Sequence, residues 1–229
     1  VDVSDQAQTL AKRWRGVLSA RPVVMLASTR EGEESLWLEA LQSNPERLAR
    51  LNARHVLWLV VPRHPQRFDE VQGLIEQAGL RCVRRSEWAD GEPDAETMAS
   101  ADAVLGDSLG EMQAYYLVSR MALLGGSFAP LGGQNLIEAA ACGCPVVMGP
   151  HTFNFSEAAA LAKQEGAALQ VQDMQAALDL VAVALADPQW HQQAQWASVR
   201  LLQNGRGAVA QHIQALRSSI HFNLSGGVV

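Results

Sequence analysis

Short apolar runs rich in β-branched residues alternate with helical patterns along most of the chain. The runs that predict strands are PVVMLAS (22–28), HVLWLVVP (55–62), RCVRR (81–85), ADAVLGD (101–107), MALLGG (121–126) and PVVMGP (145–150). Strands that alternate with helices form βαβ units, and continuous apolar strands of this kind occur in parallel sheets that helices cover on both faces. The hydrophobic pattern therefore predicts a doubly wound α/β fold.

Helical periodicity is clearest in residues 65–80, where apolar side chains recur at helical spacing and Gly79 marks the C-terminal end. Residues 86–97 are rich in turn-forming residues and predict a surface loop. The same criteria predict further helices at 31–42, 109–120, 172–188, 188–205 and 209–220.

This pattern divides the chain into three segments. Residues 1–21 predict a polar linker and a leading helix, residues 22–205 the α/β domain, and residues 206–229 a C-terminal helix and tail. Because the first segment has no initiator Met, we expect the chain to be a fragment of a longer protein.

Composition narrows the classes of function. The 229 residues are 48% hydrophobic and carry a formal net charge of −6, which suits a soluble globular protein and argues against nonspecific binding of nucleic acid. Cys82, Cys142 and Cys144 lack metal-ligand spacing, and we expect them to be reduced cysteines that pack in a cytosolic protein. No apolar run approaches the roughly 20 residues that a membrane helix needs, so we expect no membrane span.

Glycine pairs flank the loop that follows the predicted strand 121–126. Gly125 and Gly126 end the strand, and Gly132 and Gly133 precede a helix expected to begin near Gln134 or Asn135. Free N–H groups at a helix N-terminus bind anions, and ligands of parallel sheets lie beyond the carboxyl ends of the strands, so this loop could hold a phosphate. The structural alternative is a capping box between Asn135 and Glu138. The stretch alone leaves both interpretations open.

Polar residues also follow the other predicted strands and should meet at the same edge of the sheet. For Glu33 and Glu34 we expect ordinary acids in a first helical turn rather than catalysts. Arg63 and His64 lie between two prolines directly after a buried strand, which would hold a basic pair rigidly toward an anion. For this pair we favour a binding role.

Taken together, these motifs resemble the C-terminal half of bacterial 3-deoxy-D-manno-octulosonic acid (Kdo) transferases. The resemblance covers most of residues 22–208, and the combination is far more specific than any one glycine pair. The motifs that carry it are ASTREGEE (27–34), VPRHPQRFDEV (61–71), RRS (84–86), LGDSLGEMQAYY (105–116), GGSFAPLGGQNLIEAAACGCPVVMGPHTFNFSE (125–157) and the N-x-GA pattern at 204–208.

The resemblance implies a Rossmann-like C-terminal domain of the glycosyltransferase B fold. Residues 22–205 would bind the nucleotide sugar CMP-Kdo, with no metal and no further cofactor, and the full-length enzyme would transfer Kdo with inversion to the lipid A precursor in lipopolysaccharide biosynthesis. The catalytic base and the membrane-facing surface belong to the N-terminal domain in this family. We therefore expect a fragment that binds the donor but transfers nothing, from an enzyme at the cytoplasmic face of the inner membrane.

Site residues follow from the matching motifs. Glu138 would accept hydrogen bonds from the ribose hydroxyls, and Ser127 would line the sugar side. The other expected donor contacts, to phosphate or nucleotide, are Arg63, His64, Gly110, Glu111, Met112, Gly132, Gly133, Gln134 and Asn135. For His151 the sequence leaves a sugar contact and a cap of the next helix equally open.

Two positions depart from the family pattern. Gln134 replaces the His of the common GGHN motif, and it donates hydrogen bonds but carries no charge and shuttles no proton. Arg30 replaces the His of STHEGEE and keeps a cation. We expect Gln134 only to help place the phosphate.

Two alternatives stand beside this interpretation. One is a related enzyme of the same fold that uses a UDP sugar, as a transferase or an epimerase, which nucleotide preference would separate. The other is a noncatalytic nucleotide-binding or docking domain, in which the glycine loops are only turns.

Overall fold

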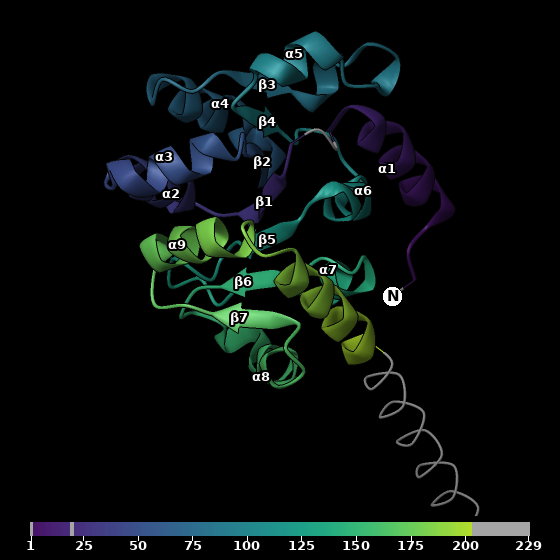
Figure 1. Cartoon of the computed structure of the whole chain (residues 1–229), viewed down its shortest axis with the longest axis vertical. Helices are drawn as coiled ribbons and strands as arrows, with labels where there is room; N and C mark the ends of the chain where they lie inside the picture. Colours follow the sequence, from purple (N-terminus) through teal and green to yellow (C-terminus); the bar gives the residue numbers. More distant parts are fainter. Residues whose placement is uncertain (1, 19–20, 203–229) are drawn as a thin grey trace, which may run out of the picture.

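The computed structural model of the chain describes residues 2–18 and 21–202 (Figure 1). The predicted segment 206–229, with its helix at 209–220, lies outside the described residues. None of the described helices is both long and apolar enough to span a bilayer.

A parallel sheet with the strand order β3-β4-β2-β1-β5-β6-β7 forms the centre of the domain. The chain builds outward from β1 on one side and then returns to place β5 against the other side of β1, so the strand order reverses between β1 and β5. The strands are β1 (Val23–Thr29), β2 (Leu57–Pro62), β3 (Cys82–Arg84), β4 (Ala103–Leu105), β5 (Met121–Leu124), β6 (Val146–Met148) and β7 (Ala168–Gln170). The predicted doubly wound α/β fold is confirmed.

The sequence predictions and the structure differ at several elements. β7 was missed, as were two helices, α3 (Pro45–Ala53) and α8 (Ser156–Gln164). The predicted loop 86–97 was wrong in part, because its end forms the start of α5 (Ala95–Ser100), capped by the Asp94 side chain. The predicted helices correspond to α2 (Glu33–Gln42), α4 (Phe68–Gln77), α6 (Met112–Val118), α9 (Met174–Ala184) and helical residues 188–202.

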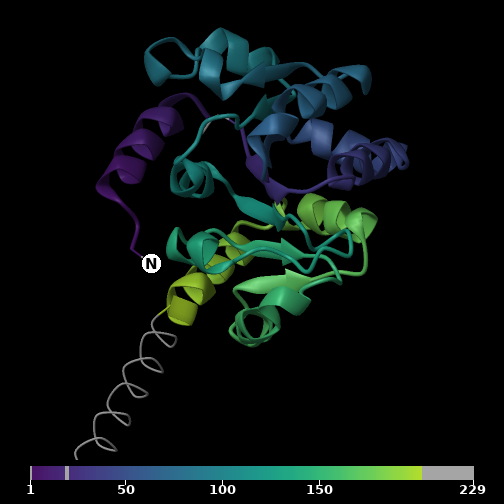
Figure 2. The ribbon, with the colours of Figure 1, turned by 180° about the vertical axis from the view of Figure 1, so that it is seen from behind.

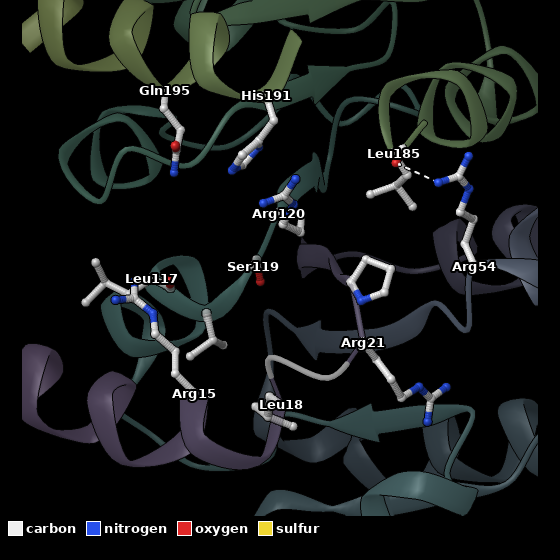
Figure 3. A pocket seen from close by; sticks show the side chains of 12 residues that line it. Arg15, Leu18, Arg21, Arg54, Leu117, Ser119, Arg120, Leu185, His191 and Gln195 are labelled. Atoms are coloured by element: carbon white, nitrogen blue, oxygen red, sulfur yellow. Dashed lines mark hydrogen bonds between the residues drawn. The ribbon is translucent and has the colours of Figure 1, made fainter. Parts of the chain in front are cut away.

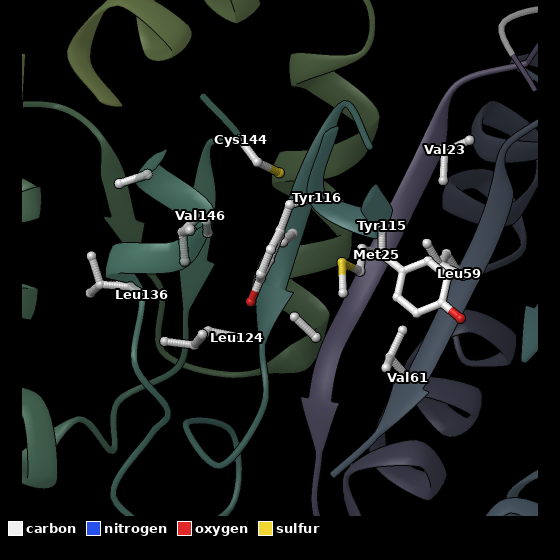
Figure 4. Packing of buried hydrophobic residues seen from close by; sticks show 14 of the residues in the cluster. Val23, Met25, Leu59, Val61, Tyr115, Tyr116, Leu124, Leu136, Cys144 and Val146 are labelled. Carbon is white, nitrogen blue, oxygen red and sulfur yellow. The ribbon is translucent and has the colours of Figure 1, made fainter. Parts of the chain in front are cut away.

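Helices cover both faces of the sheet because successive strand residues point to opposite faces. Val24 and Leu26 of β1 join a cluster with α2, α3, α4 and α9. Val23 and Met25 join the other cluster, with α1 (Asp5–Leu18), α6, α7 (Ile137–Ala141) and α8. Figure 4 shows part of this second cluster, in which the aromatic side chains of α6 lie among those of the strands.

Helix α1 lies beside α6 and is part of this core (Figure 2). The Trp14 side chain is fully buried, and its indole N–H donates to the Gly91 carbonyl at 3.0 Å. The leading helix therefore packs against the α/β domain.

A buried ion pair joins the ends of β1 and β2. Arg67 donates to both oxygens of Glu34, at 2.9 and 3.0 Å, and the Thr29 hydroxyl donates to the same carboxylate at 2.6 Å. Burial alone lowers the pKa of Arg67, but its hydrogen bonds to Glu34 and Glu70 outweigh that effect and raise the pKa above its usual value. The pair anchors the loop after β2 to the first turn of α2.

Breaking this pair should be costly, because Glu34 would remain as an uncompensated buried charge. We expect Arg67→Met to lower the free energy of unfolding by about 3–5 kcal/mol, measured by urea denaturation. The matched control is Arg50→Met, since Arg50 forms an exposed pair with Glu46 at 3.6 Å; its effect should stay below about 1 kcal/mol. Equal effects of the two substitutions would contradict the importance of the buried pair.

Gly125 is needed where β5 passes close to the end of β1. Its N–H donates to the Ala27 carbonyl at 2.8 Å, and a Cβ atom there would overlap the Ser28 carbonyl oxygen. We expect Gly125→Ala to lower the free energy of unfolding by about 3 kcal/mol. Gly16→Ala is the control, because an added Cβ in α1 meets no atom of the described residues and should raise stability by up to about 1 kcal/mol. An unchanged denaturation midpoint for Gly125→Ala would refute this account.

Candidate functional site

The candidate site lies at the carboxyl edge of the sheet, where the loops after β1, β2, β4, β5 and β6 leave their strands. The reversal of strand order between β1 and β5 separates the neighbouring loops there, which is the position where open α/β sheets bind ligands. The glycine-rich segment 125–136 is the loop that follows β5. The structure therefore brings the predicted loops to one edge.

Glu33 fixes the two loops that flank this reversal. Its side chain is fully buried, and its carboxylate accepts hydrogen bonds from backbone N–H groups of the loops after β1 and β5. The donors are Arg30 at 2.9 Å, Gly126 at 2.7 Å, Phe128 at 3.0 Å and Ala129 at 3.3 Å. Glu33 lies in the first turn of α2, as predicted. The sequence did not indicate that its carboxylate also joins the two loops.

The glycine loop makes a compact turn before α7. Gly126, Gly132 and Gly133 have φ values of 70°, 87° and 80°, a left-handed backbone that glycine adopts without strain. The Gly133 N–H donates to the Gly126 carbonyl at 2.7 Å, which closes the turn. A Cβ atom at Gly132 would overlap the Asn154 side chain. Close packing accounts for part of this glycine pattern.

The start of the following helix was predicted wrongly. Helix α7 begins at Ile137, and its N-cap is Leu136 with no side-chain cap, so neither Gln134 nor Asn135 begins it. Asn135 Oδ1 instead accepts from the Ile137 N–H at 3.0 Å, and the described hydrogen bonds include no capping box with Glu138. The five residues of α7 give it only a small dipole, so an anion here would depend on individual N–H groups.

Several polar groups of this loop have no partner within the described part of the chain. The backbone N–H groups of Gln134 and Asn135 donate to no acceptor there, and the half-buried Glu138 carboxylate accepts no hydrogen bond. Burial raises the pKa of Glu138. Open donors and an open acceptor thus lie within one short segment.

Arg63 and His64 follow β2, between Pro62 and Pro65 as predicted. The Arg63 N–H donates to the Thr29 carbonyl at 2.9 Å, and the His64 carbonyl accepts from the Arg67 N–H at 3.0 Å. Their backbones are therefore fixed next to the end of β1. The exposed guanidinium of Arg63 forms no ion pair or hydrogen bond with any described residue, which leaves a cation available to a ligand.

Gly110 and Glu111 precede α6, which begins at Met112 and not at 109 as predicted, and Glu111 has protein partners. Arg85 donates to its carboxylate at 2.7 Å, and the Ser108 hydroxyl donates to the other oxygen. The Arg85 guanidinium in turn lies 4.9 and 5.0 Å from two tryptophan rings. A nucleotide contact of this segment stays a prediction.

The loop after β6 is bound to the glycine loop by hydrogen bonds. Ser127, predicted to line the sugar side, is fully buried: its hydroxyl donates to the Leu124 carbonyl and accepts from the Gly149 N–H at 2.9 Å. Asn154, which sequence reasoning missed, donates from its backbone to the Gly132 carbonyl at 3.1 Å and from its side chain to Leu131 at 3.1 Å. His151 does not cap the next helix, whose N-cap is Phe155.

No cluster of three or more His, Cys, Asp or Glu side chains suited to a metal ion occurs among the described residues.

None of the protein-family models compared with the chain matches it. The 3-deoxy-D-manno-octulosonic acid transferase of Bordetella pertussis is 45% identical over 203 residues, which are 89% of this chain and 46% of that protein. The transferase of the same name from Haemophilus influenzae is 32% identical over 205 residues, or 89% of this chain and 45% of that protein. The chain thus spans about half the length of these relatives.

Solved structures match the same region. The crystal structure of Anabaena HepE in complex with UDP-glucose has a TM-score of 0.60 at 16% identity over 95% of this chain and 54% of that one, which shows a shared fold. The crystal structure of the C-terminal CMP-Kdo binding domain of WaaA from Acinetobacter baumannii has a TM-score of 0.73 at 36% identity over 86% of this chain and 96% of that domain. The chain therefore belongs to the 3-deoxy-D-manno-octulosonic acid transferase family, in which it matches the C-terminal domain of the glycosyltransferase B fold.

Proposed function

We propose that this chain is the donor-binding half of a Kdo transferase and that CMP-Kdo binds at the edge of the sheet between the glycine loop and Arg63. The observation that carries the proposal is the segment 134–138, where open backbone N–H groups lie three to four residues from an unpaired, half-buried carboxylate. Such a segment offers donors to a phosphate and an acceptor to ribose hydroxyls. The similarity to a CMP-Kdo binding domain supports the choice of donor.

Each open group has a role in this proposal. Glu138 accepts from the ribose hydroxyls of the donor, while the N–H groups of Gln134 and Asn135 face its single phosphate. Arg63 adds a positive charge from the end of β2, next to His64. One phosphate matches this small set of donors, and the negative charge that develops on the departing CMP would be stabilised by the same groups.

In this proposal, activation of the acceptor depends on residues outside this chain. Glycosyl transfer also needs a general base that activates the acceptor hydroxyl, and the family places that base in the N-terminal domain. We assign the lipid A precursor as acceptor to the full-length enzyme, at the cytoplasmic face of the inner membrane. The chain by itself would bind the donor without transferring Kdo.

Nucleotide titration tests the donor site. We expect the chain to bind CMP in preference to UMP in isothermal titration calorimetry. Glu138→Gln should weaken CMP binding about 10- to 100-fold, because a hydrogen bond to a charged group contributes about 1.5–3 kcal/mol. Glu46→Gln removes an exposed acid far from the site, on α3, and serves as control.

Arg63→Gln should likewise weaken CMP binding, with Arg81→Gln as the control at an exposed arginine after α4. Circular dichroism establishes that each variant is folded. Undetectable binding of CMP to the parent chain, or tighter binding of UMP, would contradict the proposal. The second result would favour a UDP-sugar enzyme.

The pH dependence of CMP binding tests Glu138 independently. The raised pKa means that the folded chain holds this proton at a higher pH than the unfolded chain, so the Glu138 charge opposes folding at neutral pH and this cost disappears as the pH falls. In the proposed site, the ionised carboxylate accepts hydrogen bonds from the ribose hydroxyls. Protonation of Glu138 weakens this acceptor, so the affinity for CMP should fall as the pH drops through the raised pKa.

The Glu138→Gln variant supplies the baseline for this titration. It should retain only the pH dependence of CMP itself, whose phosphate has a second pKa of about 6. The parent chain should therefore lose more affinity on acidification than the variant does. Parallel curves for the two proteins would exclude Glu138 as a ligand contact.

A further inference from the structure

Four arginines that form no salt bridge with a described residue lie at the opposite edge of the sheet from the candidate donor site. A cavity of about 670 Å³ opens there, next to Pro22 and Arg120, which directly precede β1 and β5. Its walls come from α1, the end of α3, the end of α6 and the helical residues 188–202 (Figure 3). Leu18, Leu117 and Leu185 form apolar parts of the lining.

The charge of this cavity is one-sided. Its lining residues include Arg15, Arg21, Arg54 and Arg120 but no Asp or Glu. The ion pairs of the described chain involve other arginines, so none of these four positive charges is neutralised by a salt bridge there. Asp102 acts on the charge of Arg21 from outside the lining. Arg15, Arg54 and Arg120 make this surface locally positive in a chain with a net charge of −6, which favours the approach of an anion.

Three of the four arginines also have structural partners. Arg15 donates to the Leu117 carbonyl at 2.6 Å, Arg54 to the Leu185 carbonyl at 3.4 Å, and Arg21 to four carbonyls including His55 at 2.7 Å. Leu117 and Leu185 lie at the C-terminal ends of α6 and α9, where cations offset the helix dipoles. Because carbonyl groups are neutral, these hydrogen bonds do not cancel the positive charge of the cavity.

The Arg120 guanidinium and one ring nitrogen of His191 lack such partners within the described residues. The guanidinium of Arg120 has no hydrogen-bond acceptor among the described residues. His191, on the helical residues 188–202, is 8% exposed, and its Nδ1 atom has no hydrogen-bond partner in the part of the chain that the structure describes. Figure 3 shows its ring next to the Arg120 side chain. Burial first, and then the Arg120 charge, lower the pKa of His191 to about 4. His191 is therefore neutral at neutral pH, and the positive charge in this part of the cavity is that of Arg120.

We propose that this cavity is a second ligand site, which takes a phosphate-bearing anion held chiefly by Arg120 with Arg15 and Arg54 at its sides. Arginine suits phosphate because its planar guanidinium donates two parallel hydrogen bonds. The volume exceeds that of one phosphate, and the leucines next to the arginines suit the organic part of a phosphate ester. The ligand could be a soluble phosphate ester or the headgroup of an anionic phospholipid, which share this chemistry.

Titration of the 229-residue chain with inorganic pyrophosphate at low ionic strength tests the site. We expect saturable binding by calorimetry, with a dissociation constant that rises about tenfold or more in Arg120→Gln and in Arg15→Gln. Arg15 is exposed, so its variant remains informative even if Arg120→Gln does not fold. Arg81→Gln, which removes the same charge outside the cavity, should bind as the parent chain does.

Variants at the two edges separate this proposal from the donor site. Arg63→Gln should keep pyrophosphate binding in the cavity, and Arg120→Gln should keep CMP binding. Absence of pyrophosphate binding, or equal binding by Arg120→Gln and the parent chain, would overturn the inference whatever CMP does. A fall in the denaturation midpoint of Arg120→Gln without any change in anion binding would instead assign Arg120 a structural role and also overturn it.

A second experiment distinguishes a phospholipid headgroup from a soluble phosphate ester as the ligand. Sedimentation with vesicles of phosphatidylcholine containing about a third phosphatidylglycerol is compared with phosphatidylcholine alone. Binding of the parent chain to the anionic vesicles, lost in Arg120→Gln, would support the phospholipid headgroup. Pyrophosphate binding without vesicle binding would support a soluble ester.

Discussion

The carboxylate of Glu33 is the interaction on which the candidate site depends. It is buried, and it accepts from backbone N–H groups that are 3 residues away in the loop after β1 and more than 90 residues away in the loop after β5. Such charge-assisted hydrogen bonds are shorter and stronger than those between neutral groups. Next to it, Glu34 binds Arg67 and so connects the loop after β2. Consecutive acids at the start of one helix thus position three of the loops.

Polar groups at this edge of the sheet divide into those that hold the loops and those that remain open. Ser127 and Asn154 bind the loops after β5 and β6 to one another, and Glu111 binds Arg85. Arg63 and Glu138 take no part in these contacts. A fully bonded network is rigid, which lowers the conformational cost of ligand binding, because the open groups are already placed when the ligand arrives. This division provides a physical criterion for separating framework residues from ligand contacts.

The sequence predicts the fold well because buried parallel strands leave a strong local signal. The run at 56–62 is apolar throughout, and residues 57–62 of it form the fully buried β2. The missed elements have weaker signals: β7 has three residues, and the segment of α3 is rich in charged residues and begins at Pro45 after the Asn44 cap. The helix before Gly143 was placed too early because Asn135 resembles an N-cap locally. The partners of Glu33 could not be predicted, since they depend on how distant loops meet.

Glu33 binds its partner loops through main-chain atoms alone. The side chains at positions 126, 128 and 129 do not take part in these hydrogen bonds, so the shape of the loop after β5 does not depend on their identity through this contact. Substitution within such a loop can alter the chemistry displayed at the edge of the sheet while the path of the chain is kept. This route would let enzymes of one fold diverge in donor preference while one buried acid supports loops of different sequence.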